Sequence, residues 1–399
     1  MRGVDGLAEV LTSLQGAALP ASVLETDLLP VRVPGYQPSD LDTLLTSGEL
    51  VWAGGGGIGA ADGRIRLVWR DQAPYLLPPP DEPPESPVHD ALRAHLAARG
   101  ASFWPDLVGA VSAAGEDYAD QAVLTALWDL VWAGEVTNDA LTPLRALLSG
   151  GSPQKRTSSK RRGRAARPNL RAMSRIGPPA GTGRWSLVSG LREPAPPATE
   201  VRLTRAQQLL ERYGVLTREM ALAEGAEGGF AGVYPVLKEL EERGQIRRGY
   251  FVAGLGAAQF ALPGAVDRLR DQRRTGMDDH EPELLVLSAV DPAQPYGAAL
   301  PWPESAGRPA RRAGSQVVLL DGEPLVLLES SGRSLVVFPA GRDDHRWIEA
   351  LGDLVRSRRV PTIEVRKVDG EPTAEHPEVR DALLSAGFSP GYKGPILRA

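Results

Sequence analysis

The fold of this chain is decided by the stretch Leu237-Lys238-Glu239-Leu240-Glu241-Glu242-Arg243-Gly244-Gln245-Ile246. Two leucines three residues apart place apolar side chains on one face of a helix. The glycine four residues later supplies the left-handed residue on which helices commonly end. Because Ile246 resumes the apolar pattern after this cap, the stretch predicts an amphipathic helix followed directly by a strand.

The same pattern occurs in two further places. Taking each glycine as the origin, leucines lie seven and four residues before it, and an apolar residue lies two residues after it. The matching positions are Leu41, Leu44, Gly48 and Leu50 in the first copy and Leu127, Leu130, Gly134 and Val136 in the second. The recurrence predicts three related helix-and-strand units.

A hairpin is expected after the cap in the first and third copies. In the first, residues 50–52 lead through four glycines at 54–57 into the alternating run 64–69; in the third, residues 246–252 turn at 254–256 into 259–262. The second copy, at 136–139, has a degenerate hairpin. This order is typical of the winged helix-turn-helix, whose second helix normally lies in the major groove of DNA. The glycine run is not a phosphate loop, because Ala60-Ala61 stand where Lys-Ser/Thr would follow.

The third copy is the most complete. Residues 204–213 are expected to form its first helix, Thr217 to cap the second, and Gly228-Gly229-Phe230 to form the turn into the recognition helix. Two interpretations of its polar residues stay open: they contact DNA phosphates, or they form a solvated face over an aromatic core of Phe230, Tyr234 and Phe251. We favour phosphate contacts, since basic residues occur on both the helix end and the wing. The predicted DNA-binding residues here are Lys238, Arg243, Arg247, Arg248 and Tyr250.

Residues 150–183 are rich in Ser, Arg, Pro and Gly. Between Lys155 and Arg175 there are nine basic residues and no acidic one, in a chain of net charge −5. Such a composition cannot bury a core, so a disordered linker is predicted. It is either only a solvated linker or also a contact to the phosphate backbone. The residues predicted to make that contact are Lys155, Arg156, Lys160, Arg161 and Arg162.

This linker and Pro-rich hinges at 78–84 and 193–197 divide the chain. We expect winged helices over 1–78, 86–149 (with the degenerate wing) and 184–274, a basic linker over 150–183 and a different module over 281–399. In that module, apolar runs at 284–287, 316–320, 325–328 and 335–338 predict a meander, with helices at 344–356 and 377–386 flanking a strand at 362–368. The predicted fold class is α+β: tandem winged-helix domains followed by a small mixed sheet or partly open barrel with flanking helices.

The composition excludes several kinds of site. Without Cys there is no disulfide, thiolate zinc site or Cys nucleophile, and the five His residues include no pair at helical ligand spacing. We therefore expect no metal and no cofactor. The N-terminal residues lack an apolar signal region and no run approaches 18 apolar residues, so a cytoplasmic protein without a membrane span is expected.

Longer motifs resemble the C-terminal region of the large helicase-related (Lhr) family of bacterial DNA repair helicases. The stretches that carry this resemblance are 3–32, 49–54, 127–134, 183–188, 211–215, 228–237, 247–251, 291–297 and 300–303. The resemblance implies a setting in DNA repair. Lhr proteins are ATP-dependent helicases that move 3′ to 5′ with two motor domains, and no motor motif occurs in this chain. It implies DNA, duplex or forked, as the partner, together with a helicase motor chain or further copies of this chain.

The Lhr C-terminal region is also similar to winged-helix DNA glycosylases, and uracil excision is associated with the family. In those enzymes a Gln near the N-terminus, often with an Asp two residues later, positions or polarises water at the glycosidic carbon of a flipped base. The resemblance places Gln15 at the Gln, but Gly16 and Ala17 follow it. Glu25 and Asp27 could supply the carboxylate as general base, or could be surface charges and a helix cap.

Two classes of function therefore remain open. The first is a non-catalytic module that grips duplex or forked DNA beside a separate motor. The second is a metal-independent, monofunctional glycosylase that removes uracil or a damaged base, with Gln15, Glu25 and Asp27 as the candidate catalytic residues.

Overall fold

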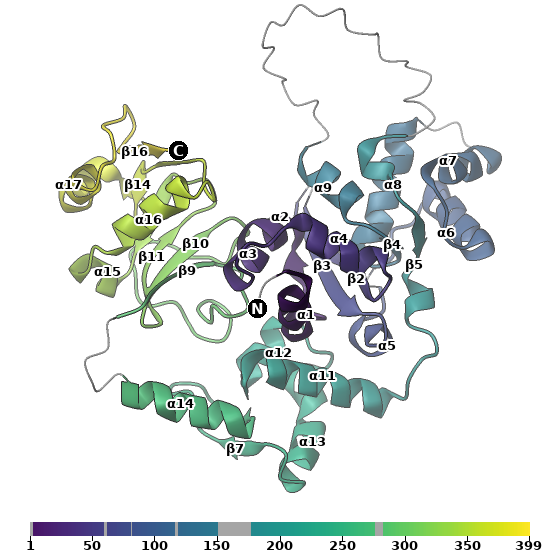
Figure 1. The fold of residues 1–399 in the computed structure, drawn as a ribbon, viewed down its shortest axis with the longest axis horizontal. Helices are drawn as coiled ribbons and strands as arrows, with labels where there is room; N and C mark the ends of the chain where they lie inside the picture. Colours follow the sequence, from purple (N-terminus) through teal and green to yellow (C-terminus); the bar gives the residue numbers. More distant parts are fainter. Residues whose placement is uncertain (1–2, 60–61, 81, 116–118, 151–176, 276–281) are drawn as a thin grey trace, which may run out of the picture. The chain divides into compact units, whose positions relative to one another are not determined.

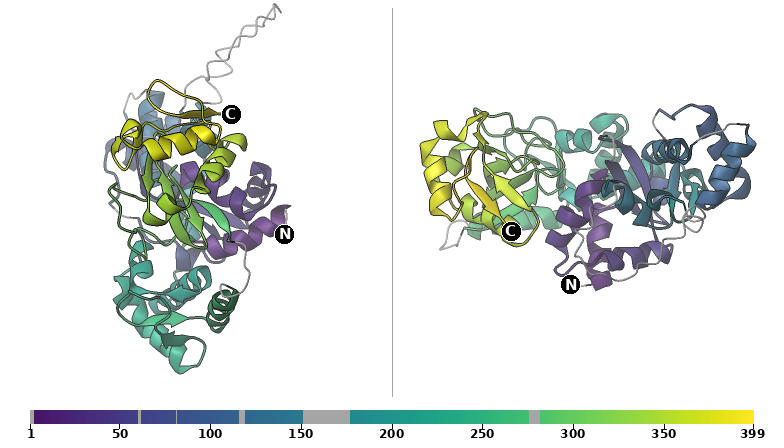
Figure 2. Two further views of the ribbon diagram at one scale, coloured as in Figure 1. Left: turned by 90° about the vertical axis from the view of Figure 1, so that its left-hand side faces the viewer. Right: turned by 90° about the horizontal axis from the view of Figure 1, so that it is seen from above.

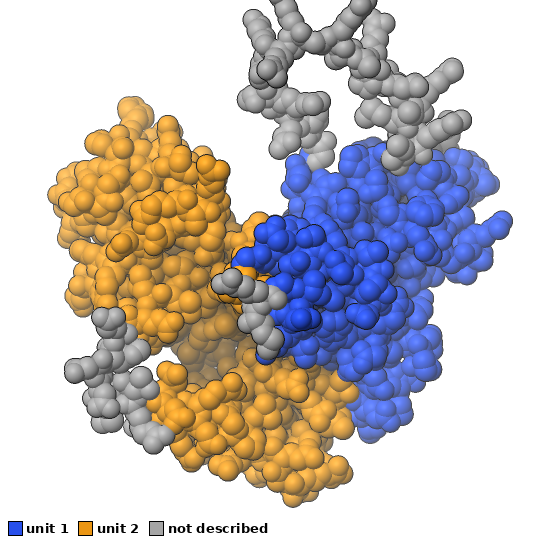
Figure 3. All heavy atoms as spheres, in the orientation of Figure 1, with its two compact units in different colours: residues 1–22, 35–201 blue, residues 23–34, 202–399 orange. Residues whose placement is uncertain are grey.

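The computed structural model describes residues 3–59, 62–80, 82–115, 119–150, 177–275 and 282–399. The chain forms two compact units, coloured separately in Figure 3. Unit 1 contains residues 1–22 and 35–201, and unit 2 contains residues 23–34 and 202–399. The five predicted DNA contacts of the basic segment, Lys155, Arg156, Lys160, Arg161 and Arg162, lie outside the described residues.

Unit 1 begins with a winged helix (Figure 1). Its elements are α1 (Gly3–Leu14), β1 (Leu19–Pro20), α4 (Pro38–Thr46), β2 (Leu50–Gly57), β3 (Gly63–Trp69) and α5 (Ala73–Leu76). The three strands form an antiparallel sheet in the order β1-β3-β2. The glycine run lies in β2 as a strand of the wing, as its sequence context predicts.

The second winged helix completes unit 1. It contains α6 (Pro87–Arg99), α7 (Trp104–Ala113), α8 (Asp120–Trp132), β4 (Val136–Asn138), α9 (Thr142–Leu148), the 3-10 turns η2 (Pro179–Gly181) and η3 (Val188–Leu191), and β5 (Trp185–Leu187). Strand β4 pairs antiparallel with β5, with Val136 opposite Leu187. The wing thus has a second strand, which comes from beyond the basic segment and so is invisible to a local reading of residues 136–139.

The third winged helix contains α11 (Ala198–Tyr213), β6 (Val215–Leu216), α12 (Arg218–Ala223), α13 (Gly229–Glu242), β7 (Arg247–Gly249), β8 (Gln259–Ala261) and α14 (Pro263–Thr275). Its strands form a sheet in the order β6-β8-β7. The core gathers apolar residues of α11, α13 and β8, and Phe230 and Tyr234 pack against it half-buried.

The repeated Leu-x-x-Leu-x-x-x-Gly pattern has the predicted conformation in all three copies. Both leucines are buried in each copy. Gly48, Gly134 and Gly244 have φ of 77°, 77° and 72°, the left-handed region that favours glycine. The amide after the second and third glycines bonds back to the second leucine, Glu135 N to Leu130 O and Gln245 N to Leu240 O, each at 2.9 Å. This satisfies helix-end carbonyls and turns the chain into the strand.

The C-terminal module is built on a mixed six-stranded sheet in the order β15-β14-β12-β11-β10-β9 (Figures 1 and 2). The strands are β9 (Leu284–Ser288), β10 (Gln316–Leu320), β11 (Glu323–Leu328), β12 (Ser334–Val337), β14 (Lys367–Val368) and β15 (Glu371–Pro372). Only the β12–β14 pair among these is parallel. Flanking elements are α15 (Pro339–Asp343), α16 (Trp347–Arg356), η4 (Thr373–Glu375) and α17 (Pro377–Ser385), with β13 (Thr362–Glu364) paired to β16 (Ile396–Arg398).

Both faces of this sheet are buried, as strand alternation requires. Val318 of β10 joins a core with α16 and α17, while its neighbours Val317 and Leu319 join a second core on the opposite face with Tyr296 and Trp302. The mixed sheet with flanking helices is therefore confirmed. In the described residues its two edge strands, β15 and β9, do not pair with each other, so the sheet is not a closed barrel.

A short segment from the N-terminal part of the sequence also belongs to unit 2. It follows α2 (Ala21–Val23) and comprises the π-helix η1 (Leu24–Leu28) and α3 (Leu29–Arg32). Helix η1 packs on β9 of the C-terminal sheet. Residues some 260 positions apart in the sequence are thus neighbours here, because Arg32 bonds to Asp291.

Candidate functional site

Helix α13 occupies the position of the groove-reading helix in the third winged helix. The Thr217 hydroxyl accepts a hydrogen bond from the Met220 amide and caps α12 as expected. Gly228 and Gly229 have φ of 70° and 59°, which permits the tight turn from α12 into α13. The side chains of α13 that face the core are Val233, Leu237 and Leu240. The opposite face of the helix is left exposed.

Three predicted DNA-binding side chains are held by glutamates of the same helix. Lys238 lies 3.5 Å from Glu242, and Arg243 lies 2.8 Å from Glu239. Arg248 of the wing lies 3.0 Å from Glu241. These pairs are largely exposed to solvent, where an ion pair contributes less than about 1 kcal/mol. A phosphate can therefore replace the glutamates at low cost.

The wing presents the most accessible of the predicted contacts. Arg247 is exposed at the start of β7, and Tyr250 just after β7 is 89% exposed. A tyrosine this exposed adds nothing to the core, yet its ring and hydroxyl suit contact with a sugar or base. The structure brings Arg247, Arg248 and Tyr250 together on one wing, next to the end of α13.

One residue that shapes this wing was missed from the sequence. Gln259 of β8 is fully buried, and its Oε1 accepts from the amides of Phe251 and Val252, both at 2.8 Å. Its Nε2 donates to the Val252 carbonyl at 2.9 Å. The only signal in the sequence is a long polar residue inside an otherwise apolar strand.

In the second copy, the corresponding helix is α8, and strands β2 and β3 of the first winged helix pack against it. A Cβ on Gly54 of β2 would lie 1.8 Å from the Val131 carbonyl of α8, and one on Gly63 would lie 2.4 Å from the Trp132 ring. The Thr137 hydroxyl also donates to the Trp52 carbonyl at 2.5 Å. Helix α8 carries no basic residue. It therefore joins the first two winged helices and offers no groove-reading face.

The corresponding helix of the first copy, α4, is acidic. It carries Asp40 and Asp42 and no basic residue, and Asp42 pairs with Arg145 of α9 at 2.9 Å. A negative helix is repelled by the phosphate backbone. Of the three copies, the third alone combines an exposed helix with a basic wing in the part of the chain that the structure describes.

The candidate catalytic residues fall into both units. Gln15 follows α1 in unit 1 and is buried. Gly16 after it has φ of 78°, and its amide donates to the Leu67 carbonyl at 2.9 Å, so the chain turns sharply here. Glu25 and Asp27 lie on the same π-helical turn, η1, in unit 2; Glu25 is half-buried and Asp27 is 5% exposed.

Asp27 is held in a polar cluster under η1. Gln316 Nε2 donates to Asp27 Oδ2 at 3.1 Å, and Arg359 Nη2 lies 3.9 Å from Asp27 Oδ1. Burial raises the pKa of the Asp27 carboxyl, which the charge of Arg359 and the hydrogen bond from Gln316 only partly offset. Single π-helical turns are frequent at functional sites. The surface-charge interpretation of Asp27 is thus wrong, because the side chain is inside unit 2.

The partners of Asp27 could not be found from the sequence. Gln316 and Arg359 lie about three hundred residues away, and neither belongs to a recognisable motif. A second link anchors the same segment: Arg32 donates to both carboxylate oxygens of Asp291, at 2.5 and 2.7 Å. Asp291 is buried, so this pair fixes the position of the segment on the C-terminal module.

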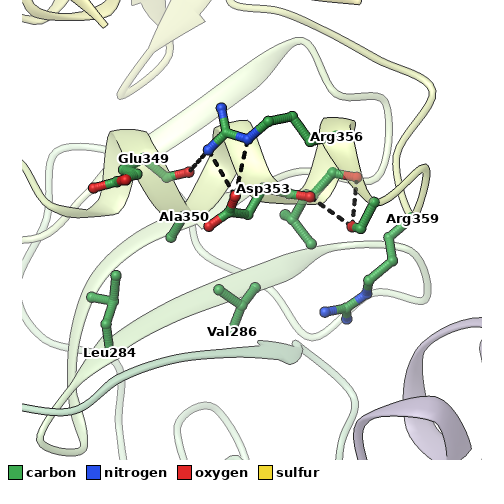
Figure 4. Close-up of a pocket in the computed structure, with 9 residues that line it drawn as sticks. Leu284, Val286, Glu349, Ala350, Asp353, Arg356 and Arg359 are labelled. Atoms are coloured by element: carbon green, nitrogen blue, oxygen red, sulfur yellow. Dashed lines mark hydrogen bonds and ion pairs between the residues drawn. The ribbon is translucent and has the colours of Figure 1, made fainter. Parts of the chain in front are cut away.

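A cavity of about 530 Å³ lies between β9 and α16, beside Arg359. It is lined by Leu284, Val286, Glu349, Ala350, Asp353, Leu354, Arg356, Ser357 and Arg359. Figure 4 shows Asp353 and Arg356 paired along α16, while Arg359 extends from the segment after the helix toward the sheet. Arg359 thus belongs to the cavity wall and also contacts the Asp27 cluster.

No group of three or more His, Asp or Glu side chains suited to a metal ion occurs among the described residues. Within the same residues, none of the helices has the length and apolar character that a membrane span requires.

Two family models match the chain. Both are described as winged-helix domains of the large helicase-related protein, one over residues 1–70 and the other over residues 195–281. The first covers the first winged helix, and the second covers the third.

Two curated relatives align with almost the whole chain. The "Lhr helicase/ probable uracil glycosylase" of Mycolicibacterium smegmatis is 42% identical over 414 residues, which cover 99% of this chain and 27% of the relative. The "Lhr helicase/uracil glycosylase" of Escherichia coli is 35% identical over 408 residues, which cover 98% of this chain and 26% of the relative. The chain therefore spans about a quarter of the length of each.

Among solved structures, the Streptomyces sahachiroi DNA glycosylase AlkZ superposes with a TM-score of 0.44 at 14% sequence identity, covering 81% of this chain and 82% of that chain.

Proposed function

Because this chain belongs to the large helicase-related family and corresponds to its C-terminal region, we propose that it is a DNA-binding module of DNA repair whose third winged helix holds duplex or forked DNA. The observation that carries the proposal is the open face of α13 beside a wing that presents Arg247, Arg248 and Tyr250. In the winged-helix arrangement, α13 enters the major groove and the wing contacts the adjacent backbone.

The ion pairs of α13 have a role in this binding. Glu239, Glu241 and Glu242 hold the basic side chains in place when DNA is absent. On binding, phosphates replace the carboxylates and counterions are released from the DNA. The glutamates also repel the DNA phosphate backbone when the helix enters the groove in a wrong position. This repulsion favours one register of the helix in the groove.

Binding of a fluorescent duplex, measured by anisotropy at several salt concentrations, tests this proposal. We expect the triple variant Lys238→Ala, Arg247→Ala, Arg248→Ala to lose at least tenfold in affinity, since each cation contributes to backbone binding. Arg380→Ala on α17 of the C-terminal module, which removes an exposed cation paired with Asp381, is the matched control. Equal affinity of the triple variant and the control would contradict the proposal.

A second function, excision of uracil or a damaged base, is favoured by the Asp27 cluster. Both curated relatives carry uracil glycosylase in their names. The reaction needs a water whose oxygen bonds to the sugar C1′ while the bond from C1′ to the base nitrogen breaks, and a base to accept the proton of that water. A buried carboxylate of raised pKa is a stronger base than an exposed one. We propose Asp27 for this role, with Glu25 and Gln15 as further candidates.

Incubation of the chain with uracil-containing and undamaged oligonucleotides in EDTA, followed by alkali, tests excision. Cleavage at uracil alone, without ATP or metal, is the expected result. Asp27→Asn should abolish it with little change in volume, whereas Asp343→Asn, which alters an exposed carboxyl of α15, should not. If the chain binds DNA but cleaves no lesion, the proposed excision activity is contradicted and the proposed DNA-binding function is retained.

The partner proposed for this module is a helicase motor, either in the same longer protein or as a separate chain, or further copies of this chain. Both relatives are named as helicases, and each is about four times as long as this chain. Mixing the purified chain with an ATPase motor of the family and measuring co-elution by gel filtration tests this association.

A further inference from the structure

A hairpin near the C-terminus presents a fully exposed aromatic ring. Residues 389–396 are closed by two backbone hydrogen bonds, Ser389 N to Ile396 O at 2.8 Å and Ile396 N to Ser389 O at 2.9 Å. Tyr392 lies at the tip and is 102% exposed. Its ring therefore contributes nothing to the stability of the module, and the fold does not account for it.

The tip is held firmly by the strands beneath it. Val365 N donates to Pro395 O at 2.9 Å. Gly394, with φ of 148°, approaches so closely that a Cβ there would lie 1.9 Å from the Val365 carbonyl. The hairpin thus lies directly on the backbone that leads into β14, near the C-terminus in Figure 1. A held loop presents its side chain with little entropy to lose on binding.

Basic side chains lie around the Glu364 carboxylate, and Glu364 pairs with Ile396 at the base of this hairpin. Arg366 pairs with Glu364, and the charges of Arg333 and Lys393 also lie close enough to that carboxylate to help lower its pKa. The amides of Arg366 and Lys367 both bond to the Arg333 carbonyl, at 2.9 and 3.2 Å, which ties these residues to one edge. Since Glu364 is neutralised by Arg366, the surroundings keep a surplus of positive charge. We call Tyr392, Lys393, Arg333 and Arg366 the Tyr392 surface.

We propose that the Tyr392 surface binds single-stranded DNA, with a base stacked on the Tyr392 ring and phosphates on Lys393 and Arg333. An aromatic platform flanked by cations is the arrangement that takes up unpaired nucleotides without sequence preference. A duplex does not fit it equally well, because its bases are already stacked and leave no open face. This site lies on the C-terminal module, apart from the proposed duplex site on α13, and its occupant is the unwound strand beside a fork.

Anisotropy of a fluorescent oligothymidine tests the proposal, with a duplex of equal length as the second probe. Tyr392→Ala should weaken oligothymidine binding by about fivefold or more, the lower limit of what stacking one base contributes. Tyr392→Phe should bind as the wild type does. Because the side chain is fully exposed, neither substitution removes packing, and duplex binding should stay unchanged in both.

Two further measurements separate stacking from charge. An abasic oligomer of the same length, which has phosphates but no bases, should bind the wild type and Tyr392→Ala equally. Lys393→Ala should reduce the slope of log K against log salt by about 0.7, the value for one phosphate of a single strand. If Tyr392→Ala binds oligothymidine as tightly as the wild type, or weakens abasic binding to the same extent, the proposal is overturned. Loss of duplex binding in the α13 variants would leave this result unaffected.

Discussion

Arg247 has no ion pair among the described residues, whereas Lys238, Arg243 and Arg248 are each paired with a glutamate of α13. It can therefore meet a phosphate without first leaving a glutamate. We expect Arg247→Ala to reduce the slope of log K against log salt for duplex binding by about 0.9, the value for one phosphate contact. Arg380→Ala on α17, which removes an exposed cation outside the winged helices, should leave the slope unchanged and serves as the comparison. A slope unchanged in Arg247→Ala would exclude a phosphate contact at this residue.

Asp27 gives unit 2 a pH dependence whose sign follows from its burial. Because burial raises the folded-state pKa, the folded chain keeps a proton that the unfolded chain has released. The resulting stabilisation is complete below the unfolded pKa of about 3.9 and is lost as the pH rises through the folded value. We therefore expect the free energy of unfolding of the wild type, relative to Asp27→Asn, to fall as the pH rises from about 4 through the raised folded-state pKa of Asp27.

Urea unfolding at several pH values measures this difference, with Asp343→Asn as the reference for loss of an exposed carboxyl. A difference between the wild type and Asp27→Asn that stays constant over this range would show that Asp27 has an ordinary pKa.

At the scale of the element, the glycines of β2 explain how two winged helices join. A side chain at Gly54 would overlap the Val131 carbonyl of α8, whereas the space around Gly57, in the same strand, is open. Gly54→Ala should therefore lower the free energy of unfolding of unit 1 by roughly 1–3 kcal/mol, as overpacking does, and Gly57→Ala should change it little. Thermal unfolding of both variants measures this. Equal melting temperatures would mean that β2 and α8 are not in close contact.

The same contact removes α8 from the helices that have a free groove-reading face. A helix in the groove-reading position needs a solvent-exposed face. In α8 the residues Val131 and Trp132 pack against the wing of the first copy instead. The Leu-x-x-Leu-x-x-x-Gly pattern is equally good in all three copies, because it specifies the buried side and the cap. It contains no information on the solvent side, where the copies differ.

At the scale of the whole molecule, the segment 23–34 ties distant parts of the sequence into unit 2. Asp291→Ala would remove the carboxylate to which both terminal guanidinium nitrogens of Arg32, Nη1 and Nη2, donate. Breaking a buried pair costs about 3–5 kcal/mol. Since the Arg32 side chain is 19% exposed, we expect a loss of stability near the lower value, about 3 kcal/mol.

Hydrogen exchange of the amides in 23–34 should accelerate in Asp291→Ala, whereas Asp343→Asn should leave these amides protected. Unchanged protection in Asp291→Ala would show that the pair does not hold the segment.

The sequence by itself determined the winged-helix repeats, their glycine caps, the mixed sheet with its flanking helices and the basic wing of the third copy. These features depend on periodicity and on conformational preferences within some twenty residues, which a sequence displays directly. The tertiary structure alone decided that β5 completes the second wing, that α8 is covered, and that Asp27 meets Gln316 and Arg359. Each of these depends on contacts between residues tens to hundreds of positions apart, and neither charge nor periodicity at one residue reveals which distant side chain will fill the space beside it.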